Sequence, residues 1–229
     1  GGALAGGGAA VERDPGAAEA RGDGEVEAVS LEESVAHVYR GADQIDGGAD
    51  YDTVYYTDSA AGITLYLDGS FAGAGGDAQG DTLANIERIY GSNLDDVIFG
   101  TTAADTVYGQ GGADTFYVVA GADFVDLGSG ADILTLISGQ DYTGASYNGG
   151  TDAGNILRLD GSNAPGTFDL TTGTFTYFNN IEFAGTTSGT LEMNMSNTLQ
   201  IASITASAAR APSDTIDITL NSLNFGSNI

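Results

Sequence analysis

Cysteine and lysine are both absent from this 229-residue chain, and histidine occurs once. Without cysteine, neither a disulfide nor a thiolate-bound metal is possible. The single histidine, His37, excludes the zinc-protease motif HExxH, and no GxSxG elbow, Cys–His pair or Walker loop is found. We therefore expect a protein that is not an enzyme. An acid/base pair of the glycosidase type stays open, because carboxylates are numerous.

Positive charge is scarce as well. Six arginines stand against 32 acidic residues, which gives a net charge of −26. Such a chain repels nucleic-acid phosphates and anionic membranes, so we expect neither as a partner. No apolar run approaches the roughly 18 residues of a spanning helix, and no N-terminal signal sequence is found. The chain begins with glycine, so we expect a processed product or a fragment.

Glycine and aspartate are abundant, and between Gly91 and Gly144 they follow a nine-residue period. The frames read GSNLDDVIF, GTTAADTVY, GQGGADTFY, VVAGADFVD, LGSGADILT and LISGQDYTG. The sixth place is always aspartate: Asp96, Asp105, Asp114, Asp123, Asp132 and Asp141. The fourth place holds Leu94, Ala103, Gly112, Gly121, Gly130 and Gly139 in turn. The eighth place is apolar in five frames: Ile98, Val107, Phe116, Val125 and Leu134. An internal period of this kind indicates stacked repeats.

The chemistry of the frame predicts its structure. Three residues, x-apolar-x, suffice for a short strand whose middle side chain points to one face. The other six residues, rich in glycine and aspartate, suit a turn. Two strands and two turns would close a coil in about eighteen residues. We therefore predict an all-β fold, a parallel β-roll or β-solenoid, with the apolar eighth places between two sheets.

In such a roll, aspartates eighteen residues apart would face each other along each edge. The rows would be Asp96, Asp114 and Asp132 along one edge, and Asp105, Asp123 and Asp141 along the other. Stacked strands lie about 4.8 Å apart, so bare carboxylates in a partly desolvated turn would repel one another. Carboxylates and turn carbonyls form an all-oxygen ligand set, which favours Ca²⁺.

At these frames the chain resembles the RTX, or haemolysin-type calcium-binding, repeat family, whose consensus is GGxGxDxUx. The resemblance implies that the sixth-place aspartate and turn carbonyls bind Ca²⁺ between consecutive coils. We carry this role to the six aspartates above, to Asp52, and to the carbonyls of Gly112, Gly121, Gly130 and Gly139. No frame combines all three consensus glycines with the aspartate. A solenoid held without metal stays open as the alternative.

The period also returns briefly before the main repeat. Two frames, one with Asp43 and Ile45 and one with Asp52 and Val54, predict a single entry coil. Next, GITLYLDG predicts a half-buried strand, and DTLANIERIYGS resembles a block that RTX proteins often place before a repeat run. We therefore predict a calcium-binding roll over residues 37–144, with an insertion at 57–90.

The flanking segments differ in composition. Residues 1–36, rich in glycine, alanine and acid, predict a flexible leader or linker, with assembly contacts as the alternative. Residues 145–229 alternate as short strands, and we expect an irregular β-rich extension that continues or caps the solenoid rather than a small sandwich. Its residues Leu157, Leu159, Phe168 and Leu170 would cover the open end. By resemblance, residues 214–229 are the place for a type I secretion signal.

The seventh and ninth places would point outward. On one sheet the residues at these places are nearly uncharged. They either form cross-strand ladders that stabilise the sheet, or they are covered by another subunit or by the C-terminal segment. They are Val97, Phe99, Thr115, Tyr117, Ile133 and Thr135 on that sheet, and Thr106, Tyr108, Phe124, Asp126, Tyr142 and Gly144 on the other.

These features predict a secreted protein, extracellular or at the cell surface, that folds on calcium. We expect a structural role in a surface layer, matrix fibre or adhesin, with further copies of the chain or other surface components as partners. The alternative is the calcium-binding C-terminal module of a larger secreted enzyme, such as a protease, lipase or polysaccharide epimerase. A soluble toxin component would need membrane-active or acylated segments, which the sequence does not show.

Overall fold

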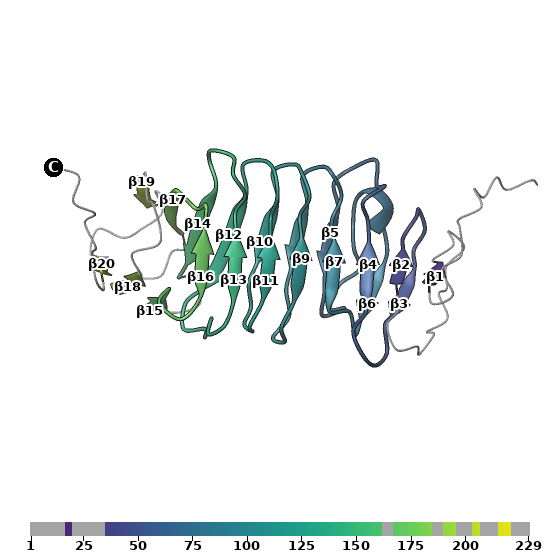
Figure 1. Ribbon diagram of the computed structural model, residues 1–229, viewed down its shortest axis with the longest axis horizontal. Helices are drawn as coiled ribbons and strands as arrows, with labels where there is room; N and C mark the ends of the chain where they lie inside the picture. The colour runs from purple at the N-terminus through teal and green to yellow at the C-terminus, as the bar shows by residue number, and fades with distance from the viewer. Residues whose placement is uncertain are drawn as a thin grey trace, which may run out of the picture.

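The computed structural model describes residues 17–19, 35–161, 167–184, 190–195, 203–206 and 215–220. Along these residues the chain winds as a β-solenoid in which short strands stack side by side and turns line both long edges (Figure 1). The one helical element among them is a short 3₁₀ turn, η1 (Gly76–Ala78). No helix of the described part has the length and apolar character that a membrane span requires. The predicted all-β class is confirmed.

Two long parallel sheets form the solenoid. The first has the order β1-β2-β4-β7-β9-β11-β13-β16, and the second the order β19-β17-β14-β12-β10-β8-β5. The first sheet consists of β1 (Ala17–Glu19), β2 (Val35–His37), β4 (Thr53–Tyr55), β7 (Arg88–Tyr90), β9 (Thr106–Tyr108), β11 (Phe124–Asp126), β13 (Ser146–Asn148) and β16 (Thr174–Thr176). The second consists of β5 (Thr64–Tyr66), β8 (Val97–Phe99), β10 (Thr115–Tyr117), β12 (Ile133–Ile137), β14 (Ile156–Asp160), β17 (Asn180–Ala184) and β19 (Ser203–Ala206).

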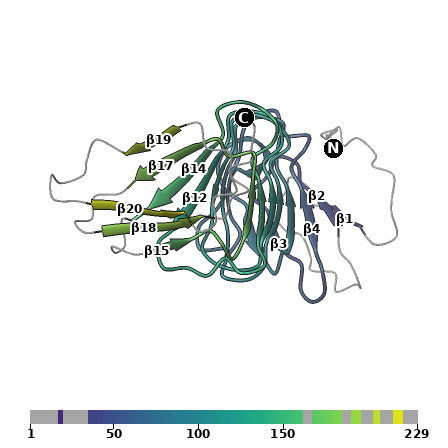
Figure 2. The ribbon, with the colours of Figure 1, turned by 60° about the vertical axis from the view of Figure 1, so that its left-hand side comes forward.

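Two smaller parallel sheets accompany them. Near the N-terminal end, β3 (Gln44–Asp46) pairs with β6 (Thr82–Ala84). At the C-terminal end, β15 (Thr167–Asp169), β18 (Thr190–Met195) and β20 (Thr215–Leu220) form a second layer beside β14, β17 and β19 (Figure 2). The described strands of the C-terminal extension therefore continue those of the roll.

The nine-residue period sets the register of the central coils. Val97 pairs with Thr115 in one sheet, and Thr106 pairs with Phe124 in the other, each eighteen residues along the chain. The second residue of every central strand is buried between the sheets: Ile98, Val107, Phe116, Val125 and Leu134. The same core continues into the extension through Leu157, Leu159, Phe168 and Leu170, which are all fully buried. The parallel β-roll is thus confirmed.

The sixth frame is the point at which the predicted period is wrong. Strand β12 continues to Ile137, so that Leu136 joins the core, and the next strand is β13 rather than residues 142–144. The longer strand displaces the following turn, and Tyr142 folds inward. Its hydroxyl donates to the main-chain oxygen of Ile137 at 2.6 Å. Tyr142 is therefore buried and does not point outward. Thr135, which alternates along β12 with the core residues Leu134 and Leu136, is buried as well.

The segments around the central repeat contribute to the same sheets. Within residues 57–90, β5 pairs with β8, and β7 lies between β4 and β9. At the N-terminal end, β1 pairs with β2. The rest of the predicted leader before Val35 lies outside the described residues. So does the proposed secretion signal, apart from β20.

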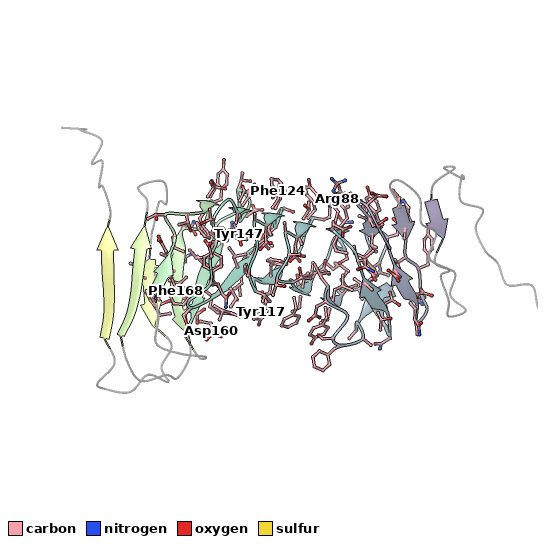
Figure 3. The ribbon with its side chains drawn as sticks, turned by 90° about the horizontal axis from the view of Figure 1, so that it is seen from below. Arg88, Tyr117, Phe124, Tyr147, Asp160 and Phe168 are labelled. Atoms are coloured by element: carbon pink, nitrogen blue, oxygen red, sulfur yellow. The ribbon has the colours of Figure 1, made fainter. Side chains whose placement is uncertain are left out.

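Stacked rings run along the outer faces. On the first sheet, His37, Tyr55, Tyr90 and Tyr108 form a tyrosine ladder with ring centroids 4.8, 4.4 and 4.6 Å apart. On the second sheet, the rings of Tyr66, Phe99 and Tyr117 stack with centroids 4.5 Å apart in each pair, and we call this stack the phenylalanine ladder after its central residue. Figure 3 shows Tyr117 on one side of the solenoid and Phe124 on the opposite side. Cross-strand ladders, one of the two predicted alternatives, are therefore present.

Candidate metal centre

The sixth-place aspartates stack in rows at the turns. Five of them, Asp96, Asp105, Asp114, Asp123 and Asp132, lie directly before a strand. The side chains of Asp114, Asp123 and Asp132 accept the main-chain N–H of the aspartate one coil earlier, whereas Asp96 accepts that of Ile63. Asp96 donates to Asp114 Oδ1 at 2.9 Å, and Asp114 donates to Asp132 Oδ1 at 2.8 Å. On the other edge, Asp105 donates to Asp123 Oδ1 at 3.1 Å. The structure thus contains a first row of Asp96, Asp114 and Asp132 and a second row that includes Asp105 and Asp123.

Burial makes these carboxylates costly to ionise. All five side chains lie inside the turns, with exposed fractions of 0–3%. Burial, with the charge of Asp96 and Asp132 adding to it, raises the pKa of Asp114 to about 8. Burial likewise raises the pKa of Asp123 and Asp132 to about 6, and it raises the pKa of Asp96 and Asp105. The rows therefore repel themselves when they are ionised without a positive partner.

Two carboxylate oxygens show where a positive partner would bind. Among the buried side chains that the structure describes, Asp114 Oδ2 and Asp132 Oδ2 have no hydrogen-bond partner. A buried, unpaired anionic oxygen is strongly unfavourable. Both atoms belong to the first row, in turns built from glycine and main-chain carbonyls. This arrangement fits an oxygen-coordinated cation such as Ca²⁺.

Three other row aspartates obtain partners from the protein itself. Ser92 donates its N–H to Asp96 Oδ2 and its hydroxyl to Asp96 Oδ1, both at 2.7 Å. Thr101 makes the same pair of contacts to Asp105, at 2.7 and 2.9 Å. Tyr147 donates its hydroxyl to Asp123 Oδ2 at 3.0 Å. These carboxylates are therefore less dependent on a metal ion than Asp114 and Asp132.

The predicted turn glycines allow neighbouring turns to approach closely. Gly112, Gly121 and Gly130 have positive φ angles of 111°, 120° and 141°. A Cβ at Gly130 would overlap the carbonyl oxygen of Gly112, and one at Gly109 would overlap Asp114 Oδ2. Side chains at these positions would fill the space that faces the row. A Cβ at Gly130 would also lie 3.3 Å from Asp132 Oδ1, so this glycine turn passes close to the first row.

Asp141 and Gly139 do not join the rows, which corrects that part of the prediction. The register of β11 and β13 places Ala145, not Asp141, beside Asp123. Asp141 is exposed and accepts hydrogen bonds from the N–H and hydroxyl of Thr143 at 2.9 and 2.6 Å, which lower its pKa. A Cβ at Gly139 would meet open space. The five-residue strand β12 moves both residues out of register.

Glu87 is a row residue that the sequence reasoning missed. The register of β4, β7 and β9 aligns Asp52, Glu87 and Asp105 along the second row. Asp52 is buried, and its N–H donates to Glu87 Oε2 at 2.8 Å. Glu87 stands nine residues before Asp96, so the repeat already reached it, with glutamate in place of aspartate. The second row therefore begins at the entry coil.

A third, shorter pair was also missed. Asp43 donates its N–H to Asp81 Oδ1 at 2.8 Å, and Tyr56 donates its hydroxyl to Asp81 Oδ2 at 2.9 Å. Both aspartates are buried, and burial raises the pKa of Asp81 to about 6. Asp43 lies at the sixth place of its frame, while Asp81 directly precedes β6. The row motif thus occurs in the β3–β6 sheet as well.

Side chains alone cannot form a complete cation site in the rows. In the described part of the chain, no three His, Cys, Asp or Glu side chains gather around one point. An ion in the first row would therefore be held by Asp114 and Asp132 together with main-chain carbonyls of the glycine turns. Carboxylate and carbonyl oxygens are the ligands that Ca²⁺ prefers.

Comparison with protein families agrees with this geometry. The model of the RTX calcium-binding nonapeptide repeat matches residues 37–55, 90–125 and 120–134, with four copies in all. These ranges contain the entry coil and every aspartate of the first row. Comparison with curated proteins found no match to the chain.

Proposed function

We propose that this chain, which carries RTX calcium-binding nonapeptide repeats, is a secreted, non-enzymatic protein. It folds on extracellular calcium and serves as a structural subunit at the cell surface. Such repeats are typical of secreted proteins. The observation that carries calcium-coupled folding is the pair of buried Oδ2 atoms of Asp114 and Asp132 without hydrogen-bond partners. These atoms make the metal-free roll unfavourable.

The energies involved are large enough to change the stability of the roll substantially. Bound calcium would supply the positive charge that the first row needs. Extracellular calcium sites have Kd values of about 10⁻⁴–10⁻³ M. At ten times Kd, each independent site adds about 1.4 kcal/mol, so two sites would add about 3 kcal/mol. That is a substantial share of the roughly 5–15 kcal/mol that stabilises a domain.

The structural role is supported by the outer faces. The phenylalanine ladder continues into Phe71, which lies 5.1 Å from Tyr66 between ring centroids and is 65% exposed. An aromatic strip on a chain of net charge −26 favours contact with another protein surface over contact with nucleic acid. We therefore propose that this face packs against a further copy of the chain or another surface component.

A calcium titration followed by far-UV circular dichroism and light scattering tests the proposal. We expect the β content and the thermal midpoint to rise between about 10⁻⁴ and 10⁻³ M Ca²⁺, with ordered assemblies once calcium is bound. Mg²⁺ at the same concentration is the control, because it demands a stricter octahedral site. A chain whose β content and thermal midpoint are the same in chelator and in Ca²⁺ would contradict calcium-coupled folding.

The aromatic face has its own test. The double variant F99S/Y117S removes two rings of the phenylalanine ladder and leaves both aspartate rows unchanged. We expect smaller particles in Ca²⁺ by size-exclusion chromatography with light scattering, with calcium binding retained. Unchanged assembly would contradict the proposed interface. Isolation of the native protein as part of a larger secreted polypeptide with a catalytic domain would favour the alternative, a calcium-binding module of an enzyme.

A further inference from the structure

Asn155 occupies the next aspartate place of the first row. Strand β14 pairs with β12 so that Ile156 lies beside Ile133, and Asn155 therefore lies beside Asp132. Asp132 donates its N–H to Asn155 Oδ1 at 3.0 Å, which repeats the Asp96–Asp114 and Asp114–Asp132 contacts. Asn155 is fully buried. Its Oδ1 thus has the same role as Oδ1 of the preceding aspartates.

The amide nitrogen of Asn155 lies among three main-chain carbonyls. Nδ2 donates to Gly150 O at 3.0 Å, Asp152 O at 3.1 Å and Tyr177 O at 3.2 Å. The first two belong to its own turn and the third to the next coil. The network fixes the orientation of the amide, because a flipped Asn155 would place its oxygen against three carbonyls and its nitrogen against an N–H.

This arrangement has more acceptors than an amide needs. An NH₂ group has two hydrogens, yet three carbonyl oxygens surround it. Tyr177, which supplies the third, has a φ of 63°, uncommon for a residue other than glycine, although its side chain is 59% exposed. Packing of the Tyr177 ring therefore does not explain why the Tyr177 carbonyl points at Nδ2. Several carbonyls aimed at one point are what a bound cation requires.

The comparison with Asp114 and Asp132 assigns a role to the amide. At those two residues the second side-chain oxygen is buried, anionic and without a hydrogen-bond partner. At Asn155 the corresponding atom is a neutral donor, and it contacts the carbonyls directly. Relying on the proposed calcium binding of the first row, we propose that the Asn155 carboxamide stands in for a calcium ion and ends the metal-dependent part of the row.

The substitution N155D tests this role, with N155A as the matched control. N155D restores a carboxylate in the row. We expect it to bind one calcium ion more per chain than the parent by native mass spectrometry. In chelator its thermal midpoint should fall by several degrees, and saturating Ca²⁺ should restore it. N155A loses the amide without gaining a ligand, so its midpoint should fall in both buffers and its calcium count should equal that of the parent.

The outcomes separate this inference from the proposed function. A parent chain that binds no calcium would refute the function itself. A parent that binds calcium, together with an N155D variant that binds the same number of ions, would overturn the role of Asn155. An N155D variant that stays unfolded at saturating calcium would overturn it as well. So would an N155A variant whose lowered thermal midpoint is restored by calcium.

Discussion

At the scale of single residues, the row aspartates differ in whether the protein supplies a hydrogen-bond donor to both carboxylate oxygens. Ser92 and Thr101 satisfy Asp96 and Asp105 with local donors. Asp114, in contrast, retains a buried oxygen without a hydrogen-bond partner among the described residues. Chemically identical places in the repeat therefore differ in their need for a cation.

The variant D114N tests this difference. In chelator near pH 7.5, we expect it to stabilise the roll by about 1–3 kcal/mol. The buried Asp114, whose pKa is raised to about 8, must take up a proton or bury an anionic oxygen when the chain folds, and asparagine does neither. In saturating Ca²⁺, we expect D114N to destabilise the roll, because a ligand is lost. Thermal unfolding by circular dichroism in the two buffers measures both effects. The control D141N alters an exposed residue outside the rows and should change neither midpoint; shifts of the same sign for D114N in both buffers would contradict the interpretation.

At the scale of strands and turns, the sequence predicted the coils wherever the period was intact. The strands centred on Ile98 and Val107 follow directly from the alternation of x-apolar-x segments with Gly/Asp turns. The prediction was wrong after Leu134, since LTLI continues as a strand and buries Leu136. The nine-residue period does not predict a longer strand here, because the extra length depends on whether the core has space for the additional side chains.

The candidate site could be predicted only in part for a related reason. Asp96, Asp114 and Asp132 followed from the spacing, and the structure places them in one row. Asn155 was missed because it stands 23 residues after Asp132 instead of eighteen, since the period is interrupted after the five-residue strand β12. Which carboxylate oxygens have donors depends on contacts between coils, and single positions in a sequence do not reveal those contacts.

The tyrosine ladder yields a prediction at the same scale. Tyr90 stacks against Tyr55 and Tyr108 at 4.4 and 4.6 Å, so Y90T removes two ring contacts. We expect a loss of about 1–3 kcal/mol, because each of the two aromatic pairs contributes about 0.5–1.5 kcal/mol and threonine retains the strand preference. Urea unfolding in Ca²⁺ measures the change. Y90F keeps the ring and should unfold like the parent; an equal loss in both variants would assign the effect to the hydroxyl.

At the scale of the whole molecule, the raised carboxylate pKa values predict how pH acts on the metal-free roll. The pKa is about 8 for Asp114 and about 6 for Asp81, Asp123 and Asp132, above the value of about 4 for unfolded aspartate. The folded chain therefore binds more protons than the unfolded chain between about pH 4 and 8. Its stability is greatest at the acid end of this range and falls as the pH rises from about 4 to 8.

Thermal unfolding in chelator at pH 5.5 and pH 8 checks this dependence. We expect the higher midpoint at pH 5.5. In saturating Ca²⁺ the order should reverse, because the ligands must be deprotonated to bind a metal. A metal-free midpoint that rises with pH would show that the rows do not govern the stability of the roll.

The tyrosine ladder also gives the molecule a natural optical reporter. The chain has no tryptophan and eleven tyrosines, and Tyr55, Tyr90 and Tyr108 lie almost parallel, with interplanar angles of 5° and 7°. Transition dipoles held this close couple, so we expect an exciton signal in the ultraviolet spectrum that exists only while adjacent coils are stacked. Calcium-dependent closure of the coils could then be timed without attaching a dye.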